Sequence, residues 1–330
     1  MIGKKDSLRI KKLSSKLYEI SREVKILRHL VWPETVRDEF FRSKSEKLPL
    51  VEYPIFDSKD IIKEIQSLEK LFSDTPYDDW LKSKTDDITA SIKLLESCGT
   101  KEFFRKSEEI YGSPKFLLRD GKTSTIDLAN NFERLIDSYY DHFSKSLKPN
   151  IVSIGNVKNE IEARIIPIFG SKSPEVLIKE DLSAKATASS KRIRLRRDAN
   201  FTGKDVEQLI NHEAFIHVAT TLNGRLQENI KILGAKYGAI TKTQEGLAVF
   251  SEFITGCIDV NRMYRISDRV IAIQMAIDGA NFIDVYRFFL KRAGKRKQAF
   301  EDSRRVFRGG LLTGGAPFTK DMVYLDGLVR

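Results

Sequence analysis

The chain has 330 residues, of which 41% are hydrophobic, and this is enough to bury a sizeable core in one or two domains. It has no run of about 18 apolar residues, which excludes a membrane-spanning helix, and its two cysteines exclude a disulfide framework and suit a reducing cytoplasm. The net charge of +11 favours acidic partners, although a solvated basic surface accounts for it equally well.

The first 149 residues are predicted to form a helical subdomain. The charged N-terminus lacks the apolar stretch of a signal peptide, so none is expected. Apolar residues recur near a 3.6-residue period from Leu8 to Val24, and Trp32 with Pro33 interrupts the pattern. The predicted helices span residues 7–46, 58–73, 77–97, 100–111 and 125–147. No catalytic motif lies in this part, so we expect it to support the rest of the chain.

From about residue 150 the sequence becomes richer in strand formers. Residues 163–169 and 175–178 are predicted strands. Residues 192–196 alternate between arginines on one face and apolar residues on the other, which predicts a strand with one wet face. The run 184–190 before it consists mostly of small residues. A strand without bulky side chains lets an extended peptide approach and add as a further strand, so this run is a candidate peptide-binding edge.

Two of the four histidines, His212 and His217, lie in one predicted helix, and Glu213 follows the first of them. Thr202 and Asp205 form a capping box at its start, and Gly224 is the expected stop. Paired histidines and a neighbouring carboxylate are the parts of a zinc hydrolase site, but the familiar spacing is i, i+4. At i, i+5 a regular helix places the rings about 140° apart. We therefore predict a local distortion of the helix, such as a π-bulge, between the two histidines.

A third ligand is needed, because catalytic zinc sites keep three protein ligands and one open position. Glu245 follows a predicted N-cap at Thr243 and opens a second amphipathic helix, in which apolar residues recur up to Ile254. Glu252 competes with it, but it lies about 10 Å further along the same helix face, so the two cannot bind one ion. We favour Glu245. Residues 266–279 and 281–294 are predicted to be further helices.

Four features together resemble one family. They are the helix with the spaced histidine pair, the string Gln244–Ala248, the triplet Arg308–Gly310 and the stretch Gly314–Asp321. The chain resembles the QEGLA-motif family of bacterial proteins, which is related to the microtubule-associated tyrosine carboxypeptidases of animals. The resemblance covers residues 150–330 well and the N-terminal third loosely.

The resemblance implies a fold, a metal and an activity. The related animal enzymes are zinc peptidases that remove a C-terminal tyrosine, notably from tubulin tails, and the resemblance does not assign the substrate of this chain. Carried over by position, it implies one Zn²⁺ per chain, held by His212, His217 and Glu245, with Glu213 as the general base. Family members continue with more helical sequence after the position of Arg330, so this chain is either truncated or naturally shorter than they are.

Three residues near the glycine-rich C-terminal end are candidates for substrate binding. Arg308 and Lys320 are suited to bind a terminal carboxylate, and Tyr324 to donate a hydrogen bond to an oxyanion. The alternative is a structural loop with solvated charges, because nothing in the spacing assigns these roles.

We predict an α+β fold, with a zincin-like metallopeptidase core over residues 150–330 and a mostly helical N-terminal subdomain over residues 1–149. The predicted activity is that of a cytoplasmic zinc carboxypeptidase acting on a peptide or protein C-terminal tail, and the positive charge suits an acidic tail. The alternative is a non-catalytic regulatory or binding protein with a structural metal, but such a site requires a fourth ligand. A nucleic-acid binder ranks third, since no basic module with interleaved aromatic residues is present. No membrane partner is expected.

Overall fold

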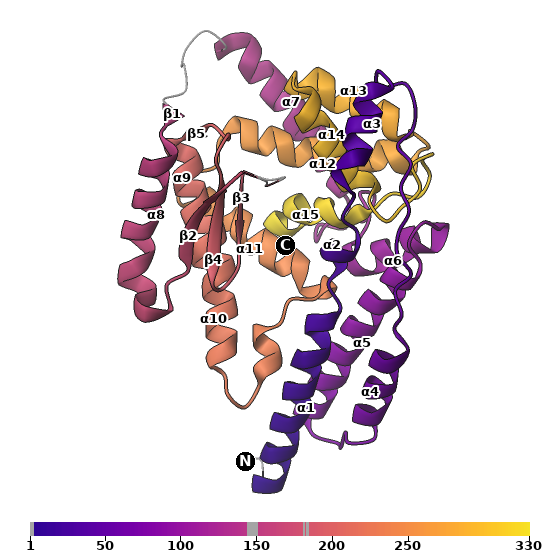
Figure 1. The fold of residues 1–330 in the computed structure, drawn as a ribbon, viewed down its shortest axis with the longest axis vertical. Coiled ribbons are helices and arrows are strands. Elements are labelled where there is room, and N and C mark those ends of the chain that lie inside the picture. The colour runs from indigo at the N-terminus through magenta and orange to yellow at the C-terminus, as the bar shows by residue number, and fades with distance from the viewer. Residues whose placement is uncertain (1–2, 144–150, 181, 183–184) are drawn as a thin grey trace.

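The computed structural model describes residues 3–143, 151–180, 182 and 185–330, and within these the fold is mostly helical with two small β-sheets (Figure 1). This confirms the predicted α+β class. Among the described helices, none combines the length and the apolar composition that a membrane crossing requires.

Seven helices are described in the N-terminal part, close to the predicted positions. They are α1 (Lys4–Glu23), α2 (Ile26–His29), α3 (Glu34–Arg42), α4 (Lys59–Glu69), α5 (Pro76–Glu96), α6 (Lys101–Tyr111) and α7 (Thr125–Phe143). The predicted helix over residues 7–46 is divided at Val24 as well as at Pro33, because the chain turns there and buries both Val24 and Ile26. The last predicted residues of the helix over 125–147 lie outside the described residues.

The middle of the chain forms a small sheet covered by helix α8 (Ile154–Phe169). Residues 163–169 belong to this helix, so the predicted strand there is wrong. Ser153 caps the helix, and Val157, Ile161 and Ile165 recur every four residues on its buried face. This helical period outweighs the local preference of the isoleucines for strands.

The three-stranded sheet has the order β2-β4-β3. Strand β2 (Glu175–Lys179) runs parallel to β4 (Arg192–Arg196), and β3 (Ala186–Ala188) runs antiparallel to β4. The predicted strands at 175–178 and 192–196 are confirmed, including the alternation that buries Ile193 and Leu195. Strand β3 covers part of the predicted run 184–190, of which residue 184 lies outside the described residues. A short ladder pairs β1 (Ile151–Val152) with β5 (Phe201–Thr202).

The remaining elements lead from the sheet to the end of the chain. They are α9 (Gly203–Leu209), the π-helix η2 (Ile210–Val218), α10 (Ala219–Leu226), α11 (Thr241–Ile254), α12 (Val260–Ile277), α13 (Phe282–Ala293), α14 (Arg296–Phe307) and α15 (Val323–Val329). Short 3-10 turns separate some of these helices, at Lys231–Gly234, Gly238–Ile240 and Thr319–Met322, and a further one at Gly170–Lys172 connects α8 to β2. The helix predicted at 266–279 begins six residues earlier, since Asp259 caps it. The one predicted at 281–294 is confirmed as α13.

Two hydrophobic cores organise these elements. The smaller core lies between α8, the sheet and the helix that carries the histidines. The larger core joins the N-terminal helices to α12, α13, α14 and α15, so the first and last thirds of the chain pack together (Figure 1). The predicted domain boundary between residues 149 and 150 lies outside the described residues, and it stays a prediction.

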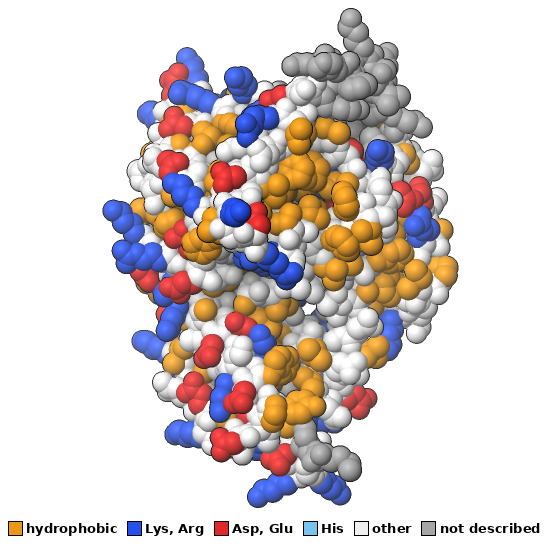
Figure 2. Space-filling model, turned by 180° about the vertical axis from the view of Figure 1, so that it is seen from behind, with side chains coloured by type: hydrophobic (Ala, Val, Ile, Leu, Met, Phe, Trp, Pro, Cys, Tyr) orange, Lys and Arg blue, Asp and Glu red, His pale blue; other side chains and the backbone are white. Residues whose placement is uncertain are grey.

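Seen from behind, the molecule shows apolar side chains gathered over its middle, and the basic side chains of this face stand among acidic ones without forming a stripe (Figure 2). Four apolar residues of α11 are exposed, namely Leu247, Phe250, Phe253 and Ile254. The predicted apolar period of Leu247, Phe250 and Ile254 therefore faces solvent, and the helix buries Ala248 and Val249 instead.

Candidate metal centre

The two histidines lie on a π-helix. Residues Ile210–Val218 are wound as a π-helix between α9 and α10, which confirms the predicted distortion. Because a π-helix returns near its starting face after five residues, the rings of His212 and His217 meet, with their centroids 4.9 Å apart. The capping box of Thr202 and Asp205 at the start of α9 is also confirmed.

The predicted helix stop at Gly224 is wrong, since α10 continues to Leu226. A Cβ built on Gly224 would lie 2.3 Å from the carbonyl oxygen of Leu233. The glycine therefore serves close packing between α10 and the following turn, and it does not end the helix.

Glu245 brings a third donor to the two rings from α11. Its Oε2 lies 3.4 Å from Nε2 of His212 and 3.4 Å from Nε2 of His217. Helix α11 begins at Thr241, so Thr243 is not its cap and Glu245 lies one turn further in than predicted. The three side chains form the one group of three or more such donors found among the described residues, with ligand atoms within 4.8 Å of one another.

This donor set fits a zinc ion. Ligand atoms about 2.1 Å from a tetrahedral metal lie about 3.4 Å from each other, which is the spacing between Glu245 and each histidine. The set of two imidazoles and one carboxylate leaves the fourth position of a tetrahedron open, as catalytic zinc sites require.

Glu252, the competing ligand, lies on the other side of the His212 ring. Its Oε1 accepts a hydrogen bond from Nδ1 of His212 at 2.6 Å. Arg262 of α12 donates to the same carboxylate through Nε at 3.1 Å and Nη2 at 3.0 Å. Glu252 therefore orients His212 and is not in the ligand group. The seven-residue spacing from Glu245 to Glu252 placed both on one helix face, but nothing in the sequence pointed to Arg262.

The charges of the site favour a cation between its three donors. Burial lowers the pKa of His212, but its contacts with Glu245 and Glu252 outweigh this and raise it to about 10. Burial raises the pKa of Glu245, but Lys320 and the two histidines lower it well below its usual value. The site thus places the ionised carboxylate of Glu245 next to the ring of His212, which has a raised affinity for a proton. Both groups favour a positive charge between them.

Glu213 is half-buried and lines a large cavity beside the histidines. Within the described ranges its carboxylate makes no hydrogen bond or ion pair with a side chain. It is therefore available to exchange a proton with a molecule in the cavity.

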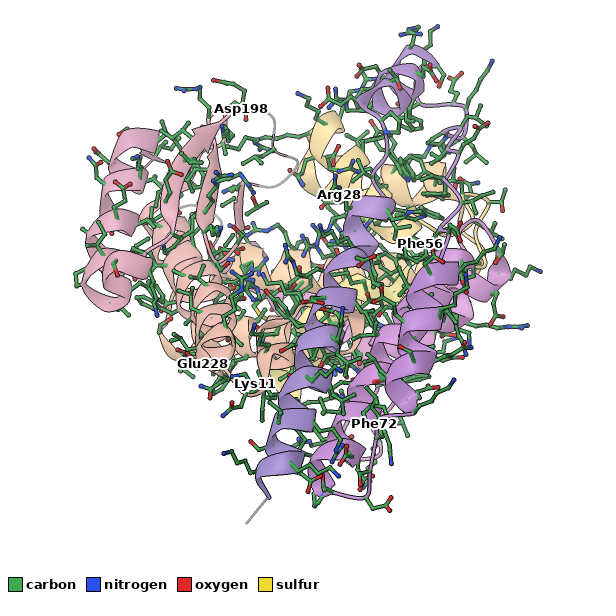
Figure 3. The ribbon with its side chains drawn as sticks, turned by 60° about the horizontal axis from the view of Figure 1, so that its bottom comes forward. Lys11, Arg28, Phe56, Phe72, Asp198 and Glu228 are labelled. Atoms are coloured by element: carbon green, nitrogen blue, oxygen red, sulfur yellow. The ribbon has the colours of Figure 1, made fainter. Side chains whose placement is uncertain are left out.

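The cavity has a volume of about 1950 Å³ and lies between the sheet and the helical body. Asp198, after β4, and Arg28, on α2, stand on its two sides (Figure 3). Strand β3 lines it with one edge, since the other edge is paired with β4. More basic than acidic side chains line the cavity. The basic residue Lys236 is part of this lining, although it was not predicted from the sequence to be a site residue. Burial lowers the pKa of Lys236, and Glu213 and Glu245 partly offset this effect.

The three predicted substrate-binding residues also line the cavity. Lys320 is buried, with Nζ 3.8 Å from Oε1 of Glu245 and 3.8 Å from Oδ1 of Asp321. The hydroxyl of Tyr324 lies 3.5 Å from Nη2 of Arg305, which is itself paired with Asp321. Lys320 is therefore close to the candidate ligand Glu245, and Tyr324 lies next to Lys320, whose Nζ is 5.4 Å from the centroid of its ring.

Arg308 differs from these two because no described carboxylate pairs with it. Its guanidinium lies over the ring of Phe318, 5.7 Å from the centroid, and its Nε is buried without a hydrogen-bond partner in the described structure. Burial and the nearby Arg305 lower the pKa of Arg308 to about 10. A partly buried guanidinium without a carboxylate partner is suited to bind an incoming anion.

No curated protein matches this chain. A family model described as microtubule-associated tyrosine carboxypeptidase matches residues 38–330. The matched range includes His212, Glu213, His217 and Glu245, and it covers the N-terminal helices from within α3 onward. The match extends well beyond the motifs that carried the resemblance in the sequence. The chain therefore belongs to the microtubule-associated tyrosine carboxypeptidase family.

Proposed function

We propose that this protein is a zinc-dependent carboxypeptidase with a zincin-like core, and that it removes the C-terminal residue of a peptide or protein tail. The observation that carries the proposal is the position of Glu245, whose Oε2 lies 3.4 Å from Nε2 of both His212 and His217. These three residues would hold one Zn²⁺ per chain. Bound there, the ion supplies a Lewis acid that lowers the pKa of a water molecule and polarises a carbonyl group.

Glu213 is the proposed general base. It lines the cavity next to His212, and its carboxylate is not engaged by any described side chain. It takes a proton from the attacking water and then donates it to the nitrogen of the leaving amino acid. Lys320, beside Glu245, and Tyr324 are proposed to donate hydrogen bonds to the oxygen that becomes negative in the transition state.

Arg308 is the proposed anchor for the terminal carboxylate of the substrate. It is a cation in the cavity without a described carboxylate partner, and a guanidinium can bind a carboxylate through two parallel hydrogen bonds. This anchor would select chain ends over internal peptide bonds, because only a chain end carries the carboxylate.

The rest of the cavity suits an extended and acidic tail. The free edge of β3 can pair with a substrate backbone, as the small side chains of Ala186 and Ala188 permit close approach. The basic lining, with Arg194 and Lys236 on its walls, would attract acidic side chains. The family description names tyrosine as the residue removed, and we propose tyrosine for this chain as well. A cytoplasmic location would place the enzyme with such tails, and it suits the two unpaired cysteines.

The competing hypothesis of a non-catalytic protein with a structural metal has less support. A structural zinc site is closed by a fourth protein ligand, whereas the candidate group in the described residues has three members. That hypothesis also does not explain why the carboxylate of Glu213 lies beside the site without a hydrogen bond or ion pair to a described side chain.

The test combines metal content with hydrolysis. Wild-type protein should contain about one zinc per chain and release the last residue of tyrosine-ended peptides in a chelator-sensitive reaction. Glu245→Ala should lose the zinc, and Glu213→Gln should keep it while turnover falls at least about 100-fold. Glu228→Gln, a change at an exposed site outside the cavity, is the matched control. Full turnover by Glu213→Gln would refute the assignment of the base.

A further inference from the structure

The backbone of Gly309, next to Arg308, is held by residues from the N-terminal part of the chain. Its N–H donates to the hydroxyl of Tyr53 at 2.7 Å, and its carbonyl oxygen accepts from the N–H of Gly99 at 2.8 Å. The hydroxyl of Tyr53 also accepts from Nε1 of Trp32 at 2.8 Å. The hydroxyl of Tyr53 thus connects Gly309 to Trp32, which is distant from Gly309 in the sequence.

Gly309 cannot easily move from this position. Its φ is +84°, in the region that favours glycine, and a Cβ built on it would lie 2.2 Å from the ring of Phe103. On the other side, the N–H of Arg308 donates to the carbonyl of Arg304 at 2.9 Å, which ends α14. The backbone of Arg308 is therefore fixed by α14 before it and by the Tyr53 hydrogen bond after it.

The side chain of Arg308 is placed by the same N-terminal elements. Its guanidinium lies over Phe318, and Phe318 packs against Phe103 at 5.4 Å and Tyr111 at 5.4 Å, both on α6. Tyr53 itself is not among the residues that line the cavity. An effect of Tyr53 on a ligand must therefore pass through a neighbour that does line the cavity, either Trp32, its hydrogen-bond partner, or Arg308, which it reaches through Gly309.

We propose that Tyr53 is a positioning residue for Arg308, and that through it the N-terminal part of the chain sets the affinity for the substrate's terminal carboxylate. This inference rests on the proposed role of Arg308 as the carboxylate anchor. Burial raises the pKa of Tyr53 to about 12, so its hydroxyl stays neutral and available to the N–H of Gly309 across the physiological range. Without the hydroxyl, two buried N–H groups lose their acceptor, and the Gly309 turn is released.

The test compares peptide binding with and without a terminal carboxylate. A tyrosine-ended peptide and its C-terminal amide are titrated into zinc-loaded protein that carries Glu213→Gln to prevent cleavage, and the ratio of the two dissociation constants is the readout. In this background Arg308→Met should reduce the preference for the free acid about tenfold or more. Tyr53→Phe should reduce it about fivefold and leave zinc content unchanged.

A matched control and a double variant separate positioning from general destabilisation. Tyr286→Phe removes another buried hydroxyl, one without a hydrogen-bond partner in the described part of the chain, and should leave the preference unchanged. In the presence of Arg308→Met, Tyr53→Phe should have no further effect on the ratio, because the two changes act on one contact.

The outcomes distinguish the two proposals. If Arg308→Met reduces the acid preference but Tyr53→Phe does not, or if the two effects multiply independently, the positioning role of Tyr53 is wrong and the anchor stands. If the protein with Arg308 intact does not prefer the free acid, the anchor is wrong and the inference about Tyr53 falls with it.

Discussion

Glu252 accepts a hydrogen bond from Nδ1 of His212 at 2.6 Å, and this bond turns the opposite ring nitrogen toward Glu245. A carboxylate in this position selects the tautomer of the histidine and makes it a better metal ligand. Glu252 is fully buried and is also the partner of Arg262. It therefore connects the metal ligands to α12.

Glu252→Gln should weaken zinc binding about 10- to 100-fold, because the ring loses its charged acceptor while the side chain keeps its shape. The measurement is competition with a chromogenic chelator at fixed pH. Glu228→Gln should leave the affinity at the wild-type value. Equal zinc affinity in Glu252→Gln and wild type would show that this hydrogen bond does not tune the ligand.

The metal-free protein and zinc binding should respond to pH in opposite ways. The folded-state pKa of His212 is raised from 6.5 to about 10, so its proton stabilises the metal-free fold. This contribution is fully present below pH 6.5 and is lost as the pH rises through about 10. Zinc must displace the same proton, so zinc affinity should increase over that range.

The measurements are urea unfolding of the metal-free protein and zinc competition, each at several pH values from 6 to 10. His212→Gln should remove the pH dependence of the unfolding free energy that this histidine causes. A metal-free protein whose stability increases steadily over this range, by an amount that His212→Gln removes, would contradict the prediction.

Helix α15 crosses α11 at a pair of glycines next to the ligand Glu245. A Cβ built on Gly246 would lie 2.4 Å from the backbone of Gly327. Gly246→Ala should therefore lower the free energy of unfolding by about 2 kcal/mol or more and weaken zinc binding, since the helices must separate. Gly155→Ala, on α8 with no atom near the added Cβ, is the control and should be close to neutral. Wild-type stability in Gly246→Ala, measured by urea denaturation, would refute the crossing.

Arg9 of α1 forms an ion pair with Asp78 of α5. Asp78 also forms the capping box of α5 together with Thr75. The hydrogen bond from Arg9 holds the pKa of Asp78 well below its usual value. The stabilisation is thus present above the unfolded pKa of 3.8 and is lost as the pH falls through the folded value. Asp78→Asn should cost about 2 kcal/mol at neutral pH and reduce the loss of stability in acid.

The neighbouring exposed residue provides the control for this pair, since Asp79→Asn should change stability by less than about 0.5 kcal/mol. Equal unfolding free energies for Asp78→Asn and Asp79→Asn at pH 7 would show that the Arg9 pair contributes nothing.

The sequence predicted the local geometry of the metal centre well because the constraint was short-range. A spacing of five residues between His212 and His217 can place both rings on one ion only if the helix is distorted, and the π-helix is that distortion. The position of Glu245 beside the two histidines is as expected from its residue type and its place on a second helix. That Glu252 orients His212 could not be predicted, because it depends on how α11 packs against the π-helix.

The wrong predictions about the fold also arose from contacts between residues that are distant in the sequence. Residues 163–169 have strand propensity, yet the burial of Val157, Ile161 and Ile165 against the sheet makes them part of a helix. Gly224 resembles a helix end, yet the packing of Leu233 requires a glycine inside the helix. In both cases a contact distant in sequence overrides a local preference.

The π-helix also determines what a change in chain length would do. It is wound more loosely than an α-helix, with i→i+5 in place of i→i+4 hydrogen bonds, and this winding is confined between α9 and α10. Deleting one residue between the histidines would restore the common H-E-x-x-H spacing on a regular helix and would keep the metal ligands together. The same deletion would rotate α10 by about 100° and turn Gly224 away from Leu233. With the five-residue spacing, one continuous helix can place His212 and His217 together at the candidate metal site and also place Gly224 against Leu233.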